Sequence, residues 1–383
     1  MKKILYSILT LVLGLVLSSS GCNTMDAPDP SMTGDGSAAN PYVISTPAQL
    51  DAMRDDLDAY YKLGGNIDLT NYLKSGGAGY AKWGTKGWEP IGDAANSFQG
   101  GFDGAGFKIT GLTINRPTTD YVGLFGYIYS PVTTPFVKNV GLEGVSIIGN
   151  KNVGSVVGTI EKCSIKNCYV TGTVKGSEYV GGVAGYIDQC NINYCFTTGS
   201  VNGNSRVGGL AGGSNSGSIT NNYATCAVSG TDSQIGGVVG NATGGTVSYC
   251  YSTGEVNGCD KVGGVVGESI SWCTISNCVA LNQAINRILS SLSDNFGRVL
   301  GGGYAVSTFI NNAAWVFITG LGGITYGEGG RNGANLSIAT IQSDGTLGSR
   351  FSTPNWVITA GKLPVLSGFQ AGTQNNNIPT FIF

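Results

Sequence analysis

The chain has 383 residues, of which 63 are glycine, only 11% are charged and none is histidine. Its net charge is −2 and its Lys and Arg residues are scattered, so the basic stripe that nucleic-acid binding requires is missing. The lack of histidine excludes catalytic Ser-His and Cys-His pairs and the commonest zinc ligand. Glycine together with β-branched and aromatic residues instead favours strands joined by tight turns.

Residues 1–21 are predicted to form a lipoprotein signal peptide. Lys2 and Lys3 precede an apolar stretch, residues 4–17, that is short for a membrane span. The next residues, Ser-Ser-Gly-Cys at 19–22, resemble a lipobox, in which Cys22 is lipidated and becomes the mature N-terminus. The motif usually has leucine where Ser19 stands. An ordinary signal peptide with an incidental Cys22 and an uncleaved membrane anchor are the alternatives.

Residues 22–40 are polar and contain Pro, Gly and Asp, which predicts a flexible tether. Residues 41–115 are predicted to form an N-terminal cap and the first turns of the fold. A strand at residues 42–44 leads to a helix that starts near Thr46, with Pro47 at its first position. The apolar side of this helix carries Ala48, Leu50, Met53 and Leu57.

Three aromatic residues of this region are candidate ligand-facing side chains. Tyr80, Trp83 and Trp88 follow a glycine-rich stretch at residues 76–79. Aromatic rings grouped in this way could stack against a sugar. The alternative is that they pack inside the cap, as large aromatic side chains commonly do.

Residues 116–320 contain a repeat, and it determines the predicted architecture. A glycine-rich box starts at Val153, Val180, Val207, Ile235 and Val262, with a shorter relative at Val122 and a further one at Val299. A second box runs in phase with the first. Aligned, the second boxes give one aliphatic, one aromatic, one threonine and one valine column: Ile165, Ile192, Ile219, Val247 and Ile275; Tyr169, Phe196, Tyr223 and Tyr251; Thr171, Thr198, Thr225 and Thr253; Val174, Val201, Val228 and Val256.

A spacing of about 27 residues with like residues in each column predicts an all-β, single-stranded parallel β-helix, also called a β-solenoid. Each turn of chain then stacks on the last at about 4.8 Å, and columns become ladders. We expect a right-handed coil, because parallel crossovers are overwhelmingly right-handed. Each box contains glycine at least twice, and glycine destabilises a helix, which argues against a helical array. The box glycines provide either positive φ at corners or close backbone packing.

Residues 321–383 lose the pattern and are predicted to form a C-terminal irregular turn and cap. Residues 337–348 suit a short helix. Residues 356–358 and 363–366 suit a closing strand.

Apart from Cys22, nine cysteines remain, and three accounts of them are open. Cys168, Cys195, Cys250 and Cys278 share one column, and Cys163, Cys190 and Cys273 precede three of these by five residues. They could be buried free thiols, which pack as small hydrophobic groups. They could form disulfides within one turn, such as Cys163–Cys168. Metal binding is the third account, although C-x4-C is not a zinc-ribbon spacing.

Other polar groups give no clear site. The residues just before the boxes form a mixed column that suits a solvated edge, with a binding groove as the alternative: Lys151, Glu178, Ser205, Ser233 and Asp260. The acids Glu143, Glu161, Asp188 and Glu255 fall at different positions of their turns, so no repeated carboxylate pair is expected. Asparagines such as Asn167 and Asn277 are expected to stack as turn ladders rather than bind sugar.

The paired boxes, VGGxxG and NCY-x-T-G-x-V, resemble the GLUG motif over most of residues 40–320. This resemblance implies a β-helical protein of the bacterial surface, adhesin-like and without catalytic residues to carry over. Related regions accompany some immunoglobulin A peptidases, whose zinc motif needs histidine and is therefore absent here.

The sequence thus predicts a non-enzymatic lipoprotein, held by its lipid in the outer membrane of a Gram-negative bacterium. We expect it at the cell surface, with the periplasmic face as the alternative. It would bind a host glycan, glycoprotein or matrix ligand, as a monomer, without cofactor, metal or nucleic acid. The competing hypotheses are a carbohydrate-active β-helix enzyme acting on polysaccharide and a structural spacer of a surface assembly.

Overall fold

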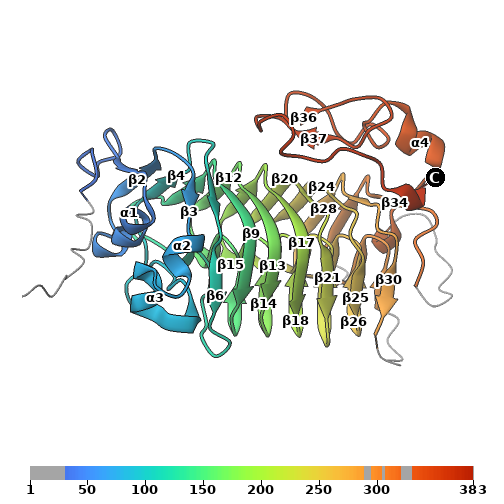
Figure 1. Cartoon of the computed structure of the whole chain (residues 1–383). Helices are drawn as coiled ribbons and strands as arrows, with labels where there is room; N and C mark the ends of the chain where they lie inside the picture. Colours follow the sequence, from blue (N-terminus) through green and yellow to red (C-terminus); the bar gives the residue numbers. More distant parts are fainter. Residues whose placement is uncertain (1–30, 289–294, 304–306, 321–329, 383) are drawn as a thin grey trace, which may run out of the picture.

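The computed structural model describes residues 31–288, 295–303, 307–320 and 330–382. Cys22 and the predicted signal peptide lie outside the described residues. Within them the chain winds into a parallel β-solenoid whose strands lie side by side along its length (Figure 1). The named strands of successive described coils pair in parallel, so the predicted all-β, parallel β-helical fold is confirmed.

Three sheets form the walls of the solenoid. The broad sheet has 22 strands, because each coil contributes two segments to it. Its first column contains β1 (Tyr42–Ile44), β2 (Tyr60–Leu63), β4 (Gly101–Asp103), β8 (Phe136–Lys138), β12 (Ser164–Lys166), β16 (Asn191–Asn193), β20 (Ser218–Ala224), β24 (Thr246–Ser252), β28 (Thr274–Ser276) and β33 (Thr308–Ile310). Its second segments are β3 (Ile67–Asp68), β5 (Lys108–Thr110), β6 (Thr113–Asn115), β9 (Gly141–Ile148), β13 (Tyr169–Lys175), β17 (Phe196–Gly203), β21 (Ala227–Gly230), β25 (Val256–Gly258), β29 (Val279–Ala280), β30 (Ile285–Arg287), β34 (Ala313–Trp315) and β35 (Ala334–Leu336).

The other two walls are narrower. The third sheet, which carries the start of each glycine box, has six strands: β10 (Lys151–Val153), β14 (Glu178–Gly181), β18 (Ser205–Gly208), β22 (Ser233–Gly236), β26 (Asp260–Gly263) and β31 (Phe296–Gly297). The second sheet, which follows each box, has seven: β7 (Phe125–Ile128), β11 (Val157–Glu161), β15 (Ala184–Asp188), β19 (Ala211–Asn215), β23 (Val239–Thr243), β27 (Val266–Ile270) and β32 (Leu300–Gly303).

The aliphatic and valine columns form ladders inside the solenoid. Ile165 pairs with Ile192, and Ile192 pairs with Ile219, each fully buried. Val174 likewise pairs with Val201 in the next coil. Buried side chains from Ile44 to Ile382 form one hydrophobic cluster, as the stacking prediction required.

The box glycines serve close packing rather than positive φ. A Cβ on Gly182 would lie 2.4 Å from the carbonyl oxygen of Gly209, and a Cβ on Gly209 would lie 2.2 Å from that of Gly237. Real Cβ atoms do not approach so closely, so only glycine lets the coils stack here. The corners with positive φ are filled mainly by other residues, such as Asn167 and Asn277, both at φ 53°. Asparagine tolerates this left-handed conformation.

The last box starts at Phe296, not at Val299. Phe296 pairs with Val262, and Leu300 pairs with Val266, so the sequence alignment was shifted by three residues. Arg298 therefore occupies the position of a box glycine. Its Nη1 donates to Asn335 Oδ1 at 2.7 Å and its Nη2 to the Gly333 carbonyl at 3.1 Å.

The N-terminal cap contains the predicted helix. α1 (Pro47–Ala52) begins at the N-cap Thr46, whose side chain accepts from the Gln49 N–H, and has Pro at its start. Leu50 on its apolar side and Met53 just after it are fully buried, whereas Leu57 lies beyond the end of the helix, which is shorter than expected. α2 (Thr70–Leu73), α3 (Ala78–Trp83) and the short 3-10 turns η1 (Met53–Asp55) and η2 (Gly84–Lys86) complete the region. Among the described residues, no helix has the length and apolar character needed to cross a membrane.

The C-terminal segment, residues 330–382, turns back along the solenoid. It contains η3 (Gly330–Asn332), α4 (Ile338–Ser343), η4 (Thr380–Ile382) and an antiparallel pair, β36 (Trp356–Val357) and β37 (Val365–Leu366). Before it turns back, β35 adds to the stack by pairing with β34. The β36–β37 pair then lies over the outside of the broad sheet, near β20 and β24 (Figure 1). The segment for which we expected a cap thus covers a lateral face.

Candidate functional site

The aromatic column of the repeat forms a ladder on the outer face of the broad sheet. Val170 is buried in the interior, so its neighbour Tyr169 points outward. The rings of Tyr169, Phe196, Tyr223 and Tyr251 stack nearly parallel, with interplanar angles of 6°, 3° and 1° and centroids 4.9–5.2 Å apart. This ladder ends at Tyr169, because its partner in the preceding coil is Gly141.

The C-terminal segment covers most of the ladder. Trp356 packs against Tyr223 and Tyr251, with centroids 6.4 and 5.9 Å away, and its Nε1 donates to Asn221 Oδ1 at 3.0 Å. Phe369 meets Phe196 edge to face at 5.2 Å. Tyr223 and Tyr251 are therefore buried, whereas Tyr169 stays partly exposed.

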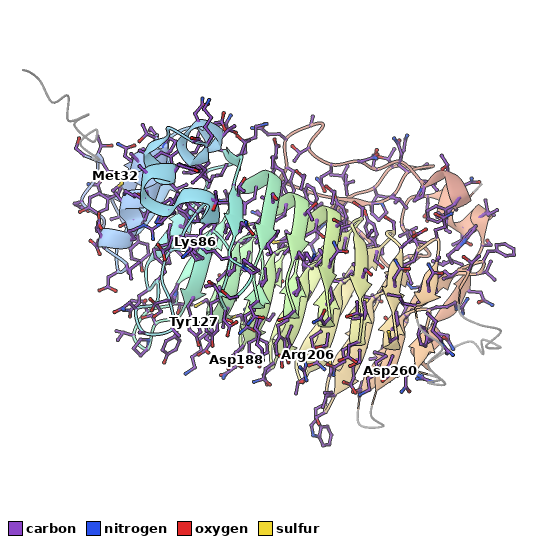
Figure 2. The ribbon with its side chains drawn as sticks, turned by 60° about the horizontal axis from the view of Figure 1, so that its bottom comes forward. Met32, Lys86, Tyr127, Asp188, Arg206 and Asp260 are labelled. Atoms are coloured by element: carbon purple, nitrogen blue, oxygen red, sulfur yellow. The ribbon has the colours of Figure 1, made fainter. Side chains whose placement is uncertain are left out.

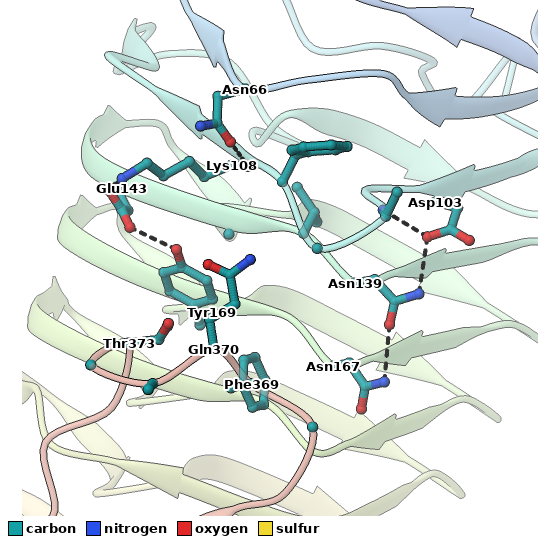
Figure 3. Close-up of a pocket in the computed structure, with 18 of the residues that line it drawn as sticks. Asn66, Asp103, Lys108, Asn139, Glu143, Asn167, Tyr169, Phe369, Gln370 and Thr373 are labelled. Carbon is teal, nitrogen blue, oxygen red and sulfur yellow. Dashed lines mark hydrogen bonds and ion pairs between the residues drawn. The ribbon is translucent and has the colours of Figure 1, made fainter.

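A groove of about 850 Å³ opens where the ladder ends. Its floor comes from β5, β9 and β13, and its side from the loop at residues 368–373 of the C-terminal segment (Figure 3). Tyr169, Phe107 and Phe369 give it aromatic surface, and Asn66, Asn139, Asn167 and Gln370 give it amides. Four charged residues line it, Lys62, Lys108, Asp103 and Glu143, so its formal charges cancel.

Glu143 is held between two partners at one side of this groove. Lys108 Nζ lies 2.8 Å from its Oε2, and the Tyr169 hydroxyl donates to its Oε1 at 2.6 Å. Partial burial raises the pKa of Glu143, but the hydrogen bonds from Lys108 and Tyr169 outweigh this and leave the pKa below its ordinary value. Burial, and then Glu143, raise the pKa of the Tyr169 hydroxyl. Glu143 is thus an ionised hydrogen-bond acceptor at neutral pH.

The opposite side of the groove is a chain of polar side chains (Figure 3). Asn167 Nδ2 donates to Asn139 Oδ1 at 3.0 Å, and Asn139 Nδ2 donates to Asp103 Oδ1 at 2.9 Å. Asn139 and Asn167 stack at successive corners with φ of 55° and 53°, which confirms the expected turn ladder. These amides have fixed positions, because the coils beneath them fix their backbones.

The three aromatic residues predicted to face a ligand, Tyr80, Trp83 and Trp88, do not form one exposed surface. Trp88 is fully buried, and its Nε1 donates to the Leu124 carbonyl at 3.2 Å, so it offers no face to a ligand. Trp83 meets Trp88 edge to face at 5.4 Å, and Arg54 lies over both rings. Tyr80 is partly exposed and shares no ring contact with either. The two tryptophans pack the cap, which corrects the proposal that Trp88 is ligand-facing.

All nine remaining cysteines are buried, as expected for packed thiols, and within the described residues none is joined to another in a disulfide. Cys163 and Cys168 form no disulfide with each other. Instead, the Cys163 N–H donates to Cys190 Sγ in the next coil at 3.1 Å. Burial raises the pKa of the Cys195 thiol well above its ordinary value, which keeps it protonated and unreactive.

The mixed polar column lies at the edge of the third sheet and lines neither of the two grooves described here. Lys151 Nζ lies 3.0 Å from Glu178 Oε2, and Arg206 reaches the other oxygen of the same carboxylate. Figure 2 shows Arg206 and Asp260 along this side of the molecule. The expectation that the acidic residues fall at different positions of their turns was wrong for one pair. Glu161 and Asp188 occupy the same position in successive coils.

A second groove, of about 860 Å³, lies near the N-terminal end and includes Asp55, Asp93 and Asp120. In the part of the chain that the structure describes, no group of three or more Cys, Asp or Glu residues is placed to hold a metal ion.

The sequence analysis missed the groove at the end of the ladder. Lys108 and Phe369 belong to no repeat column, and Phe369 approaches Tyr169 only because the C-terminal segment folds back. A usable signal was present: Gly141 interrupts the aromatic column one coil before Tyr169.

Comparison with known proteins agrees with the repeat. The model of the GLUG motif matches residues 149–175 and 231–257, each of which is one coil. The chain therefore carries GLUG motifs within its β-helical repeat. Each match begins in the third sheet, continues through the second and ends in the broad sheet, so one motif corresponds to one complete coil.

Two relatives match part of the chain. A protein of Evansella cellulosilytica, provisionally named a Gly-rich membrane protein, is 39% identical over 142 residues, 35% of this chain and 15% of that protein. Halomucin of Haloquadratum walsbyi is 35% identical over 151 residues, 38% of this chain and 2% of halomucin. The chain therefore spans a small part of the length of both.

A crystal structure shares the fold. The protein is from Bacteroides ovatus and is provisionally described as an immunoglobulin A1 protease. It superposes with a TM-score of 0.59 over 87% of this chain and 94% of that one, at 20% sequence identity. At this identity the likeness concerns the fold alone.

Proposed function

We propose that this GLUG repeat protein is a non-catalytic lipoprotein of the bacterial surface that binds an external ligand through its solenoid. The observation that carries the proposal is the groove at the end of the aromatic ladder. It combines partly exposed rings with amides and an ionised carboxylate, as small-molecule and glycan sites do. Glu143, with its lowered pKa, is a poor proton donor, which favours binding over catalysis.

The lipid anchor predicted at Cys22 and the tether predicted at residues 22–40 support surface display, although the end of that tether is not free: Thr33 pairs with Val43, and the Gly36 carbonyl accepts from the Tyr60 N–H. A tether of this composition would let the rigid solenoid stand away from the membrane. The relatives named as a membrane protein and as halomucin are consistent with a surface role. The lipid, a cell-surface rather than periplasmic orientation and the adhesin-like role belong to this proposal.

Two measurements test it. Cells grown with labelled palmitate should label the wild-type protein and not a Cys22→Ser variant, and protease added to intact cells should remove the solenoid. The mature protein should bind on glycan, glycoprotein or matrix arrays. A wild-type protein that takes up no label but binds on an array would contradict the anchor alone, and no binding on any array would contradict the binding role.

A carbohydrate-active enzyme remains the second candidate, because Asp103 and Glu143 line the same groove. Glycosidases act through two carboxylates that flank the bond to be cleaved. The test is release of reducing ends from a polysaccharide panel by the wild-type protein and by Glu143→Gln. Release that disappears in this variant would replace binding by catalysis as the function.

A further inference from the structure

We propose that Gln234 and Lys261 become joined by an isopeptide bond, which the chain forms by itself and which links two successive coils covalently. The bond joins the amine of Lys261 to the side-chain carbonyl carbon of Gln234 and releases ammonia. Glu268, which contacts both groups, carries the proton between them. This inference is independent of the proposed binding function.

Gln234 and Lys261 occupy the same corner of successive coils. Their neighbours Ile235 and Val262 pair in register, so the two residues lie one above the other. Both have positive φ, 67° and 50°, as does Arg206 at the same corner one coil earlier (Figure 2). Because the backbone conformation is the same, the two side chains leave the backbone in the same direction, and both reach the strand β27.

Glu268 of β27 lies between the two groups that react. Lys261 Nζ lies 2.6 Å from its Oε1, and Gln234 Nε2 donates to its Oε2. One carboxylate therefore faces the attacking nitrogen with one oxygen and the leaving nitrogen with the other. A carboxylate in this position acts first as a general base and then as a general acid. The fold also holds amine and amide together, which removes much of the entropic cost of their encounter.

The reacting groups lie where little water reaches them. Glu268 is 2% exposed and Gln234 is 7% exposed, whereas Lys261 is partly exposed. A buried ion pair loses much of its Coulomb attraction to desolvation, which favours transfer of a proton from Lys261 to Glu268. This transfer leaves an uncharged amine, the form that attacks a carbonyl carbon. Exclusion of water also protects the carbon of Gln234 from hydrolysis.

The reaction balances without an oxidant or a cofactor. Glu268 takes a proton from the Lys261 ammonium, and the neutral Nζ attacks Gln234 Cδ. Glu268 then gives its proton to Nε2 and receives a second proton from Nζ, the Cδ–Nε2 bond breaks, and ammonia leaves. The ammonia takes the last proton from Glu268, so an amide and an ammonium ion replace a carboxamide and an amine cation.

Asn241 supplies a donor for the intermediate of this reaction. It occupies the position of Glu268 in the preceding coil and belongs to the same coil as Gln234. It is 6% exposed, and its Nδ2 has no hydrogen-bond partner among the described residues, which costs free energy in a folded protein. The tetrahedral intermediate carries a negative oxygen on Gln234 Cδ, and an N–H donor held in place stabilises such an oxygen.

Peptide mapping tests for the bond. The protease Glu-C cuts after Glu255, which lies between the two residues, so an unlinked chain gives residues 179–255 and 256–268 as separate peptides. A linked chain gives one branched product, whose mass is the sum of both peptides less one ammonia molecule. We expect this product from the full chain after complete denaturation and reduction, with fragmentation placing the link at Gln234 and Lys261.

Three variants check the roles of the side chains. Lys261→Arg keeps the positive charge but has no amine to form the bond, and Glu268→Gln keeps the size of the side chain but cannot carry the proton. Both should give separate peptides on the two sides of Glu255. Lys151→Arg changes a lysine that also contacts a glutamate, in the third sheet, and as the matched control it should keep the linked product. Circular dichroism must show that each variant is folded.

Separate peptides from the wild-type protein would overturn the proposal, and so would a loss of ammonia that fragmentation places at a residue other than Gln234. A linked product in Glu268→Gln would confirm the bond and overturn the route through Glu268.

Discussion

Cysteine and asparagine replace each other at one buried corner of the coil because both can accept and donate there. The column contains Cys168, Cys195, Asn222, Cys250 and Cys278. Asn222 Oδ1 accepts from the Cys195 N–H at 2.7 Å, and its Nδ2 donates to the Ile192 carbonyl at 2.8 Å. The cysteines do the same more weakly: Cys195 Sγ accepts from the Cys168 N–H at 3.4 Å, and Cys250 Sγ donates to the Ile219 carbonyl at 3.5 Å.

This interchange predicts the effect of two substitutions at Asn222. Asn222→Leu leaves a buried N–H and a buried carbonyl without partners and should lower the free energy of unfolding by about 2–4 kcal/mol. Asn222→Cys restores a weak acceptor and donor and should cost about 1 kcal/mol or less. Urea unfolding monitored by circular dichroism measures both. Equal losses for the two variants would show that the corner is only a packing position.

The N-terminal cap is held together by one buried carboxylate. Asp51, on α1, accepts from Arg54 Nε at 2.6 Å and from the Tyr72 hydroxyl of α2 at 2.9 Å, and it pairs with Lys82 of α3. Desolvation raises the pKa of Asp51, but the hydrogen bonds from Lys82, Arg54 and Tyr72 bring it below the ordinary value. Three helices thus depend on a single charge.

We expect Asp51→Asn to destabilise the cap by about 2 kcal/mol at pH 7, because two of its partners are partly exposed and can be solvated. The folded-state pKa is lowered, so the stabilisation by Asp51 is complete above the unfolded value of about 3.9 and is lost as the pH falls through the folded value. Thermal unfolding of wild type and variant from pH 7 to pH 2 should therefore converge below about pH 4. A difference that stays constant to pH 2 would mean that the charge of Asp51 contributes nothing.

Trp356 is the largest buried side chain of the C-terminal segment, which also hydrogen-bonds to Tyr194, Tyr223 and Tyr251 of the solenoid. Its ring packs against Phe351 at 4.7 Å as well as against two tyrosines of the ladder, and it is almost completely buried. The segment depends on this contact because β36 and β37 pair only with each other, not with the broad sheet.

Trp356→Ala should release the segment while the coils stay folded. Truncating a buried tryptophan costs about 3–5 kcal/mol, more than a short two-stranded element can offset. Hydrogen exchange followed by mass spectrometry should show loss of protection in residues 351–369 and unchanged protection in the coils. Trp356→Phe is the control and should keep most of the protection. Unfolding of the whole protein, or unchanged protection in residues 351–369, would contradict the prediction that the segment can be released from folded coils.

The whole molecule is a stack in which each coil contacts only its neighbours, so whole coils are removable units. Deleting residues 178–204 removes one 27-residue coil and joins Ser177 to Ser205, which is in register with the deleted Glu178. This variant should fold cooperatively with a somewhat lower Tm. Deleting Thr173 alone, in the middle of β13, would instead move Val174 by one place and turn it from the core toward solvent, which should strongly destabilise the stack. Circular dichroism and gel filtration of both proteins decide the matter.

The repeated coils could be predicted from the sequence, whereas the contacts of the segments outside the repeat could not. Ile165, Ile192 and Ile219 could be placed in the core because equal spacing makes equal environment, and the helix after Thr46 followed from its own cap and proline. The fate of residues 330–382 could not be predicted, because their contacts join residues more than a hundred positions apart that share no pattern, such as Trp356 and Asn221. The groove beside Tyr169 needs both parts and so was missed.

The start of the last glycine box was predicted wrongly for a related reason. Arg298 replaces a glycine whose Cβ space is elsewhere occupied by the next coil, and the substitution hid Phe296 as the start of the box. The position accepts arginine because its guanidinium turns to the segment at residues 333–335 instead of meeting another glycine box.

The parallel rings of the ladder also have an optical consequence. Light absorbed by Tyr223 or Tyr251 can pass without emission to the indole of Trp356, whose ring centroid lies 6.4 and 5.9 Å from theirs and which absorbs at longer wavelength. Tyrosine emission from these rings is therefore quenched while the indole is docked and returns when it departs. The protein thus carries an intrinsic fluorescent reporter of whether its C-terminal segment is in place.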